Sequence, residues 1–364
     1  MGRDPVDPIA ARARETGQLH AQRCGSGSPR PIPALNELER IELWLRKALD
    51  AAAAAEPAAS SAAEWLLDNG YRVQRAVLQV KQDLPRGFYR RLRPLGEGSA
   101  AGEPLCLLIA HDMLHATHFQ LSREAVLVYL RGYQEEYPLT IAELWAIPAM
   151  LRIACLERLV GGFDALFPSV PMPFAPSASC RMFLEETAPN ERVARGIANL
   201  GAISGIAWKD VFDAVSLVER VLADDPAGVY AGMDFETRDE YRRAVERIAC
   251  RCDKAELAIA DRVVGLARAE ECSPRNHVGY WLIGQGLAEL ERENGACTPI
   301  RIRVARLLLR HPGKVYTLAL FLLGLAGLAV PAAYLAEWAA TPLQWVLGIT
   351  LSILPATVIS VTLV

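Results

Sequence analysis

The amino-acid sequence predicts an all-α protein in which a multi-helix domain precedes two apolar helices, each long enough to span a membrane. Before position 300, apolar residues recur at the three- and four-residue spacing of amphipathic helices. No segment there alternates apolar and polar residues as a half-buried strand does, and no glycine-rich phosphate loop occurs. Charged residues make up 22% of the chain but are missing from two long runs near its end.

These two runs, 315–336 and 338–364, contain no charged side chain. A helix that crosses a hydrocarbon layer about 30 Å thick needs about 20 apolar residues. A buried core helix is the alternative, which two successive runs of this length disfavour. Pro331 and Pro355 are compatible with spans, because membrane helices tolerate proline. We therefore expect transmembrane helices at 315–337 and 341–364.

Basic residues before the first run predict the orientation. Only Glu337 lies between the two runs, whereas the preceding segment carries Arg301, Arg303, Arg306, Arg310 and Lys314. Because positive residues remain on the cytoplasmic side, the domain before the spans is expected in the cytoplasm of a bacterium, with a multi-pass anchor in the inner membrane. The segment 297–314 also has amphipathic spacing, so an interfacial helix on anionic lipid is an equal alternative.

The overall composition excludes some function classes. A formal net charge of −3 without a basic cluster argues against nucleic-acid binding. The eight cysteines show no CxxC spacing and are expected to be free thiols in a reducing compartment. Residues 1–33 have no apolar core, so no signal peptide is expected. Because no Lys, Arg or aromatic belt follows 353–364, we also expect the natural polypeptide to be longer.

Helix-capping and helix-breaking residues predict the order of the elements. Ser61 with Glu64 and Thr140 with Glu143 form capping-box patterns that begin two of the helices. The predicted helices cover about 36–49, 61–83, a stretch from 104, a stretch after 122, 141–160, 193–203, 209–223, 237–252, 254–268 and 277–293. The prolines of 163–179 form the best internal boundary.

These patterns predict the following organisation: 1–33, disordered tail; 34–163, helical subdomain; 164–188, proline-rich connector; 189–296, second helical subdomain; 297–314, basic juxtamembrane helix; 315–337 and 341–364, transmembrane helices.

Three groups of residues invite a functional interpretation. His111 and His115 share a helix face and His118 follows, but no metalloprotease pattern accompanies them, so a partly exposed polar face is expected and their role is open. Asp224 and Asp225 are expected to be turn residues rather than a metal motif. The tryptophans on apolar helix faces are expected in the core. No catalytic, cofactor-binding or metal-binding residue is predicted.

Four long segments resemble the N-terminal region of bacterial cyclic β-1,2-glucan synthases. They are AAEWLLDNGYRVQRAVLQVKQDLPRGFYRRL (62–92), YPLTIAELWAIPAMLRIACLERL (137–159), VSLVERVLADDPAGVYAGMDFETRDEYRRAVERIA (215–249) and HVGYWLIGQGLAELE (277–291). They follow the order of the family and lead into the membrane. The matched positions that mark the family are Pro85, Arg86, Gly87, Tyr89, Glu143, Trp145, Asp225, Pro226 and Tyr230. Helix termination and packing are the expected roles of these positions.

The resemblance implies a very long inner-membrane enzyme that polymerises glucose from the donor UDP-glucose, with a divalent metal as cofactor. The nascent β-1,2-glucan is attached to the enzyme. It also implies a glycosyltransferase domain and a C-terminal phosphorylase-like domain as partners, beside the lipid bilayer. The Gln-x-x-Arg-Trp motif of the transferase is absent here, so no catalytic residue is carried over and no cofactor is expected in this stretch. We therefore interpret the chain as a structural or regulatory N-terminal module, inactive alone. A free-standing membrane-anchored helical scaffold or regulator is the alternative.

Overall fold

A computed structural model describes residues 7–54, 61–183, 187–271, 274–295, 308, 312–338 and 340–363 of the chain. These residues form helices and connecting turns, and no strand occurs among them, so the predicted all-α class is confirmed. The chain divides into two compact units, Met1–Asn294 and Gly295–Val364, which we call the helical unit and the hairpin unit.

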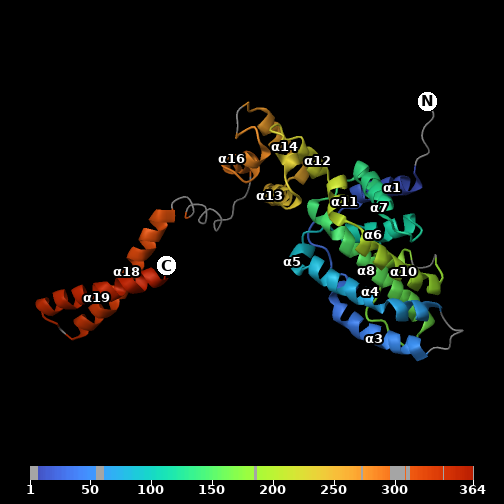
Figure 1. Ribbon diagram of the computed structural model, residues 1–364, viewed down its shortest axis with the longest axis horizontal. Helices are drawn as coiled ribbons and strands as arrows, with labels where there is room; N and C mark the ends of the chain where they lie inside the picture. The colour runs from blue at the N-terminus through green and yellow to red at the C-terminus, as the bar shows by residue number, and fades with distance from the viewer. Residues whose placement is uncertain are drawn as a thin grey trace. The chain divides into compact units, whose positions relative to one another are not determined.

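The helix α8 (Ile141–Leu166) forms the centre of the helical unit, because most of its side chains are buried. Thr140 begins it with the predicted capping box, in which the Glu143 carboxylate accepts the Thr140 N–H at 2.9 Å. The helices α4 (Ser61–Asp83), α6 (Leu105–Ala116) and α10 (Pro189–Gly205) pack around it (Figure 1).

Further helices complete this half of the helical unit. The helix α3 (Leu38–Ala54) packs along α4, and α7 (Arg123–Glu136) begins at Ser122 as predicted. The remaining elements are α2 (Pro33–Asn36), α5 (Arg86–Tyr89) and α9 (Ala178–Arg181).

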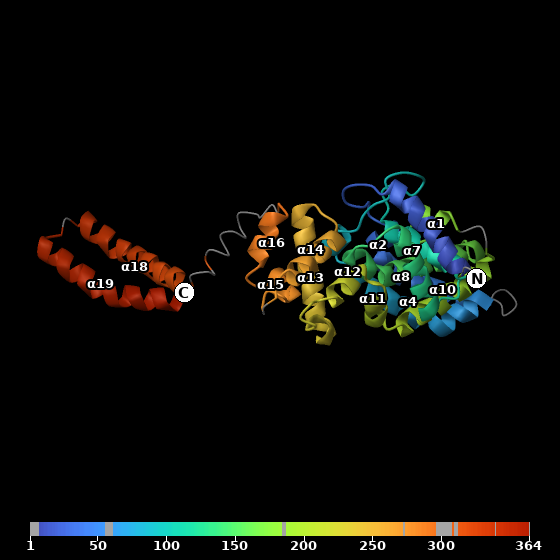
Figure 2. The same ribbon diagram turned by 90° about the horizontal axis from the view of Figure 1, so that it is seen from above.

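The elements from α11 to α16 form a separate group at one end of the helical unit, drawn mainly in yellow and orange (Figure 2). Its elements are α11 (Trp208–Val215), α12 (Leu217–Ala223), η2 (Tyr230–Gly232), α13 (Phe235–Cys252), α14 (Glu256–Arg268), α15 (Val278–Leu282) and α16 (Leu287–Glu293). Here α14 packs against α12, α13 and α15.

The predicted disordered tail 1–33 is wrong over most of its length, because α1 (Pro8–Arg23) is a helix packed on α7. Asp7 caps its start. Two glycines permit a close approach: a Cβ at Gly17 would lie 2.8 Å from the Tyr133 carbonyl oxygen, and one at Gly132 would lie 2.9 Å from that of Ala10. Small and polar residues make this interface, so α1 lacks the apolar periodicity that identifies most helices.

The predicted division into subdomains 34–163 and 189–296 is also wrong. Both lie in the helical unit, where α10 packs along α8 after the proline-rich stretch 164–188. Two predicted helices are each divided in the structure. Ser216 ends α11 and also caps α12, where its hydroxyl accepts the Glu219 N–H at 3.2 Å. The turn 283–286 separates α15 from α16.

The hairpin unit consists of α18 (Pro312–Glu337) and α19 (Pro342–Leu363), which pack against each other. Both are long and apolar enough to cross a membrane, and their large apolar side chains are exposed. This combination indicates membrane association. Lys314 lies exposed in the first turn of α18, whereas the predicted flanking residues Arg301, Arg303, Arg306 and Arg310 lie outside the described residues.

Candidate functional site

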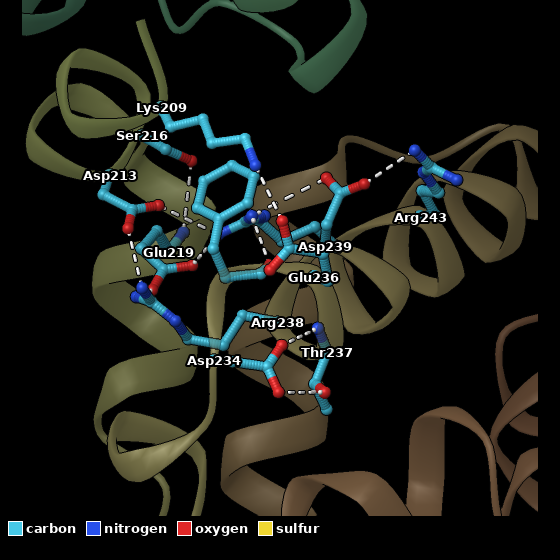
Figure 3. Close-up of polar contacts among 12 residues, drawn as sticks. Lys209, Asp213, Ser216, Glu219, Asp234, Glu236, Thr237, Arg238, Asp239 and Arg243 are labelled. Atoms are coloured by element: carbon cyan, nitrogen blue, oxygen red, sulfur yellow. Dashed lines mark hydrogen bonds and ion pairs between the residues drawn. The ribbon is translucent and has the colours of Figure 1, made fainter. Parts of the chain in front are cut away.

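The segment with the longest family resemblance, 215–249, folds into α12, η2 and α13 around a group of paired charges (Figure 3). We call this group the arginine–carboxylate network. Its members, Asp213, Glu219, Tyr230, Arg238 and Arg242, come from α11, α12, η2 and α13.

Arg242 lies at the centre of the network and its side chain is fully buried. Its guanidinium donates to Glu219 Oε2 at 2.7 Å and to Asp213 Oδ1 at 3.1 Å. The guanidinium carbon also lies 4.8 Å from the ring centroid of Phe212 and 4.6 Å from that of Phe235. Cation–π attraction is stronger when the cation is removed from water, as it is here.

Arg238, one turn before Arg242 on α13, completes the pairing. It donates to Asp213 Oδ2 at 2.7 Å and also contacts Glu219 (Figure 3). The other oxygen of Glu219 accepts the Tyr230 hydroxyl at 2.7 Å. Burial, followed by the neighbouring Glu219, raises the pKa of Asp213 and of Tyr230. Since each carboxylate is paired with arginines, the network can hold three helices together but offers no free general acid or base.

Asp225 organises the turn between α12 and η2. Its buried carboxylate accepts the N–H of Val278 at 3.0 Å and the N–H groups of Val229 and Tyr230 at 3.2 Å. His277 Nδ1 lies 2.8 Å from Asp225 Oδ2. Asp224 instead points outward to Arg268, so the two aspartates do not converge on one metal ion, and their expected role as turn residues is confirmed.

His277 continues this chain of contacts, because its Nε2 lies 3.2 Å from the Tyr241 hydroxyl. Burial, followed by Asp225, raises the pKa of Tyr241. An Asp–His–Tyr relay of this kind holds α13 and α15 to the α12–η2 turn. Sequence reasoning did not find it, because His277 lies 52 positions from Asp225 and 36 positions from Tyr241, in another resembling segment.

The resembling segments converge on the start of α8. Arg93, just after the first segment, donates to Glu143 through Nε at 2.8 Å. Trp145, two positions after Glu143, stacks on Phe212 with 4.7 Å between ring centroids and meets Phe235 edge-on. Glu143 and Trp145 therefore join the first segment to the arginine–carboxylate network.

The other family-marking positions lie at helix ends. Pro85 precedes α5, Arg86 and Gly87 are exposed in it, and the buried Tyr89 donates its hydroxyl to the Arg30 carbonyl. Pro226 is exposed in the turn that Asp225 organises. Of these positions, Tyr89 joins α5 to the loop before α2, whereas the exposed Arg86, Gly87 and Pro226 lie in a short helix and a turn. Helix termination and packing remain the roles we predict for them.

Comparison with known proteins gives one informative relative. The chain matches no family model. It is 25% identical over 333 residues to the cyclic β-(1,2)-glucan synthase NdvB of Rhizobium meliloti (strain 1021), in a match that covers 71% of this chain. The chain is related to a glucan synthase. The match covers 12% of NdvB, so this chain corresponds to a small part of that synthase. The predicted resemblance is confirmed.

The histidine cluster is not a polar surface. His111 is buried, His115 is half-buried and His118 is exposed, so the predicted partly exposed face is wrong for His111. His111 Nε2 lies 2.9 Å from Glu157 Oε2 on α8. Glu157 is 46 positions away in sequence, so local spacing could not reveal this partner.

The tryptophan prediction is confirmed with one exception. Trp44 and Trp281 are buried, and Trp145 and Trp208 pack against the core. Trp65, on the outer face of α4, is 41% exposed, so the core prediction is wrong there.

Proposed function

We propose that this chain is the N-terminal module and first two membrane spans of a bacterial cyclic β-1,2-glucan synthase. The relationship to NdvB is the observation that carries the proposal. Trp145 of the second resembling segment also packs edge-on against Phe235 of the third, with 5.9 Å between ring centroids, and Glu143 pairs with Arg93, directly after the first segment. The resembling segments therefore include residues that hold one folded unit together.

The proposed role of the module is structural or regulatory. UDP-glucose-dependent polymerisation, with its divalent metal, is assigned to other domains of the synthase. Among the buried carboxylates of the resembling segments that the structure describes, Glu143, Glu219 and Asp225 are each paired with arginine, histidine or backbone N–H groups. Groups paired in this way are poor candidates for general acid or base catalysis. The module is proposed to pack beside the glycosyltransferase and near the nascent glucan.

A transfer assay tests this assignment. Radiolabelled UDP-glucose and Mg²⁺ are added to the purified chain in detergent and to membranes that contain the full synthase. We expect labelled β-1,2-glucan only from the synthase. Labelled glucan formed by the chain alone would overturn the non-catalytic role.

The size of the native product distinguishes the proposal from a free-standing membrane-anchored scaffold or regulator. An antibody against residues 36–290 is used to blot membranes of the source bacterium. A band many times heavier than 39.8 kDa supports the synthase module. A band near that mass would support the scaffold.

The proposed location is the inner membrane, with the helical unit in the cytoplasm and α18 and α19 spanning the bilayer. Cys250 is exposed on the helical unit and serves as a label site. A membrane-impermeant maleimide should label the chain in lysed spheroplasts but not in intact ones. The part of the labelling that is lost in Cys250→Ser identifies this site. Labelling of Cys250 in intact spheroplasts would contradict the orientation.

A further inference from the structure

Three metal-ligating side chains meet in the core of the helical unit, away from the arginine–carboxylate network. They are His111 on α6, Glu157 on α8 and Cys180 on α9, and all three are buried. One potential ligand atom from each lies within 4.8 Å of the other two. Imidazole nitrogen, carboxylate oxygen and thiolate sulfur are the three donor types that zinc prefers.

Neighbouring residues hold two of the ligands in place. The Ser177 N–H and hydroxyl donate to the two oxygens of Glu157, at 3.0 and 2.8 Å. The same hydroxyl accepts the Cys180 N–H at 3.0 Å and so begins α9. Glu103 accepts the N–H groups of Ala178 and Ser179, at 2.7 and 3.0 Å. Outer partners of this kind orient ligands in metal sites.

Two of the donor groups have unused bonding capacity. His111 Nδ1 is buried without a hydrogen-bond partner. The Cys180 sulfur, also buried, makes no hydrogen bond among the described residues, whereas its backbone N–H does. Buried polar groups are nearly always satisfied, so an unsatisfied one points to a water or an ion.

We propose that His111, Glu157 and Cys180 bind one divalent transition-metal ion, with Zn²⁺ the best fit. Tetrahedral zinc separates its ligand atoms by about 3.3–3.6 Å, so the observed set needs only small side-chain shifts. The thiol proton of Cys180 passes to solvent on binding, and the coordinating nitrogen of His111 is the unprotonated one. The charges of Zn²⁺, one thiolate and one carboxylate sum to zero, which makes the ion compatible with a buried site.

Such an ion would fasten the proline-rich stretch to the centre of the fold. Cys180 belongs to that stretch, whereas His111 and Glu157 belong to two packed helices. One ion would therefore join three elements that are far apart in sequence. The proposal concerns stability and does not depend on glucan synthesis.

Cobalt substitution tests the site directly. The full chain, in detergent and without a polyhistidine tag, carries Cys250→Ser and Cys252→Ser to remove its vicinal thiols. After chelator treatment, Co²⁺ should produce a near-ultraviolet thiolate-to-metal absorption band that saturates at one equivalent and disappears on addition of Zn²⁺. Absence of this band would overturn the proposal.

Variants assign the band to the three residues. Cys180→Ser should abolish it, whereas Cys106→Ser, which changes an equally buried cysteine outside the cluster, should retain it. Ser177→Ala should weaken zinc affinity by about 10- to 100-fold in chelator competition, as loss of an outer partner does elsewhere. If Cys180→Ser does not fold, Glu157→Gln is used in its place. A band unchanged by these ligand substitutions would also overturn the proposal.

Discussion

The guanidinium of Arg242 and the carboxylate of Glu219 form a buried ion pair with 2.7 Å between Nη1 and Oε2, and this pair joins α13 to α12. Asp213 shares the same guanidinium. Burial of these charges is costly unless each remains paired. Removing the arginine should therefore damage the fold more than removing a surface arginine of the same helix.

Arg242→Met should lower the free energy of unfolding by about 3–5 kcal/mol, because Glu219 and Asp213 lose a buried partner. Arg243→Met is the matched control: its side chain is 69% exposed and, among the described residues, pairs with Asp239 alone, so a change below about 1 kcal/mol is expected. Urea denaturation followed by tryptophan fluorescence measures both. Equal losses in the two variants would contradict the importance of the network.

Glu256 should make the fold less stable as the pH rises from about 4.5 to about 7. Burial raises its pKa to about 7, so the folded chain retains a proton that the unfolded chain releases. The difference corresponds to about 3 kcal/mol at pH values above 7. Glu256→Gln retains an oxygen for the Ile141 N–H, which Glu256 accepts at 2.7 Å. We expect this variant to gain stability relative to the wild type as the pH rises through this range. A constant difference would rule out this titration.

His20 should act in the opposite direction. Burial lowers its pKa to about 4, so below pH 6.5 the unfolded chain takes up a proton that the folded chain resists. The fold therefore loses up to about 3 kcal/mol as the pH falls from 6.5 to 4. His20→Gln should reduce this loss, with the exposed His118→Gln as control. The measurement is urea denaturation at each pH, and a wild-type acid response in His20→Gln would contradict the assignment.

Two glycines should respond oppositely to alanine. A Cβ at Gly279 would lie 2.5 Å from the Tyr241 hydroxyl oxygen and 2.7 Å from His277 Nε2, so Gly279→Ala should destabilise the fold by about 1–3 kcal/mol. Gly265, inside α14, has open space around it, and Gly265→Ala should stabilise by about 0.5–1 kcal/mol. Thermal unfolding followed by circular dichroism compares them. A harmless Gly279→Ala would mean that the Asp225–His277–Tyr241 relay adapts readily.

Local sequence signals predicted much of the fold. The capping box at Thr140 and Glu143 marked the start of α8, and Ser122 marked the start of α7. The uncharged runs near the C-terminus predicted α18 and α19. These signals depend on residues within one or two helical turns of each other, so they can be read without tertiary contacts.

Signals that depend on contacts between distant segments were missed. The helix α1 is held by a close approach to α7, which neither segment reveals alone. Ser216 divides a predicted helix because its hydroxyl caps α12, in a segment whose apolar pattern continues unbroken. Nor could the sequence predict that His111 meets Glu157 and Cys180 rather than His115.

The sequence by itself determined the helical class, most helix starts, the two apolar helices and the relationship to glucan synthases, because periodicity, caps and long matching segments are local or linear properties. Only the tertiary structure decided which charges pair, which residues are buried and which ligand atoms meet. Helix packing brings Glu219 beside Arg242, and His111 close to Cys180, although many residues separate the members of each pair in the sequence. Side-chain chemistry alone does not specify these partners, because the same residue types occur throughout the chain and only packing selects among them.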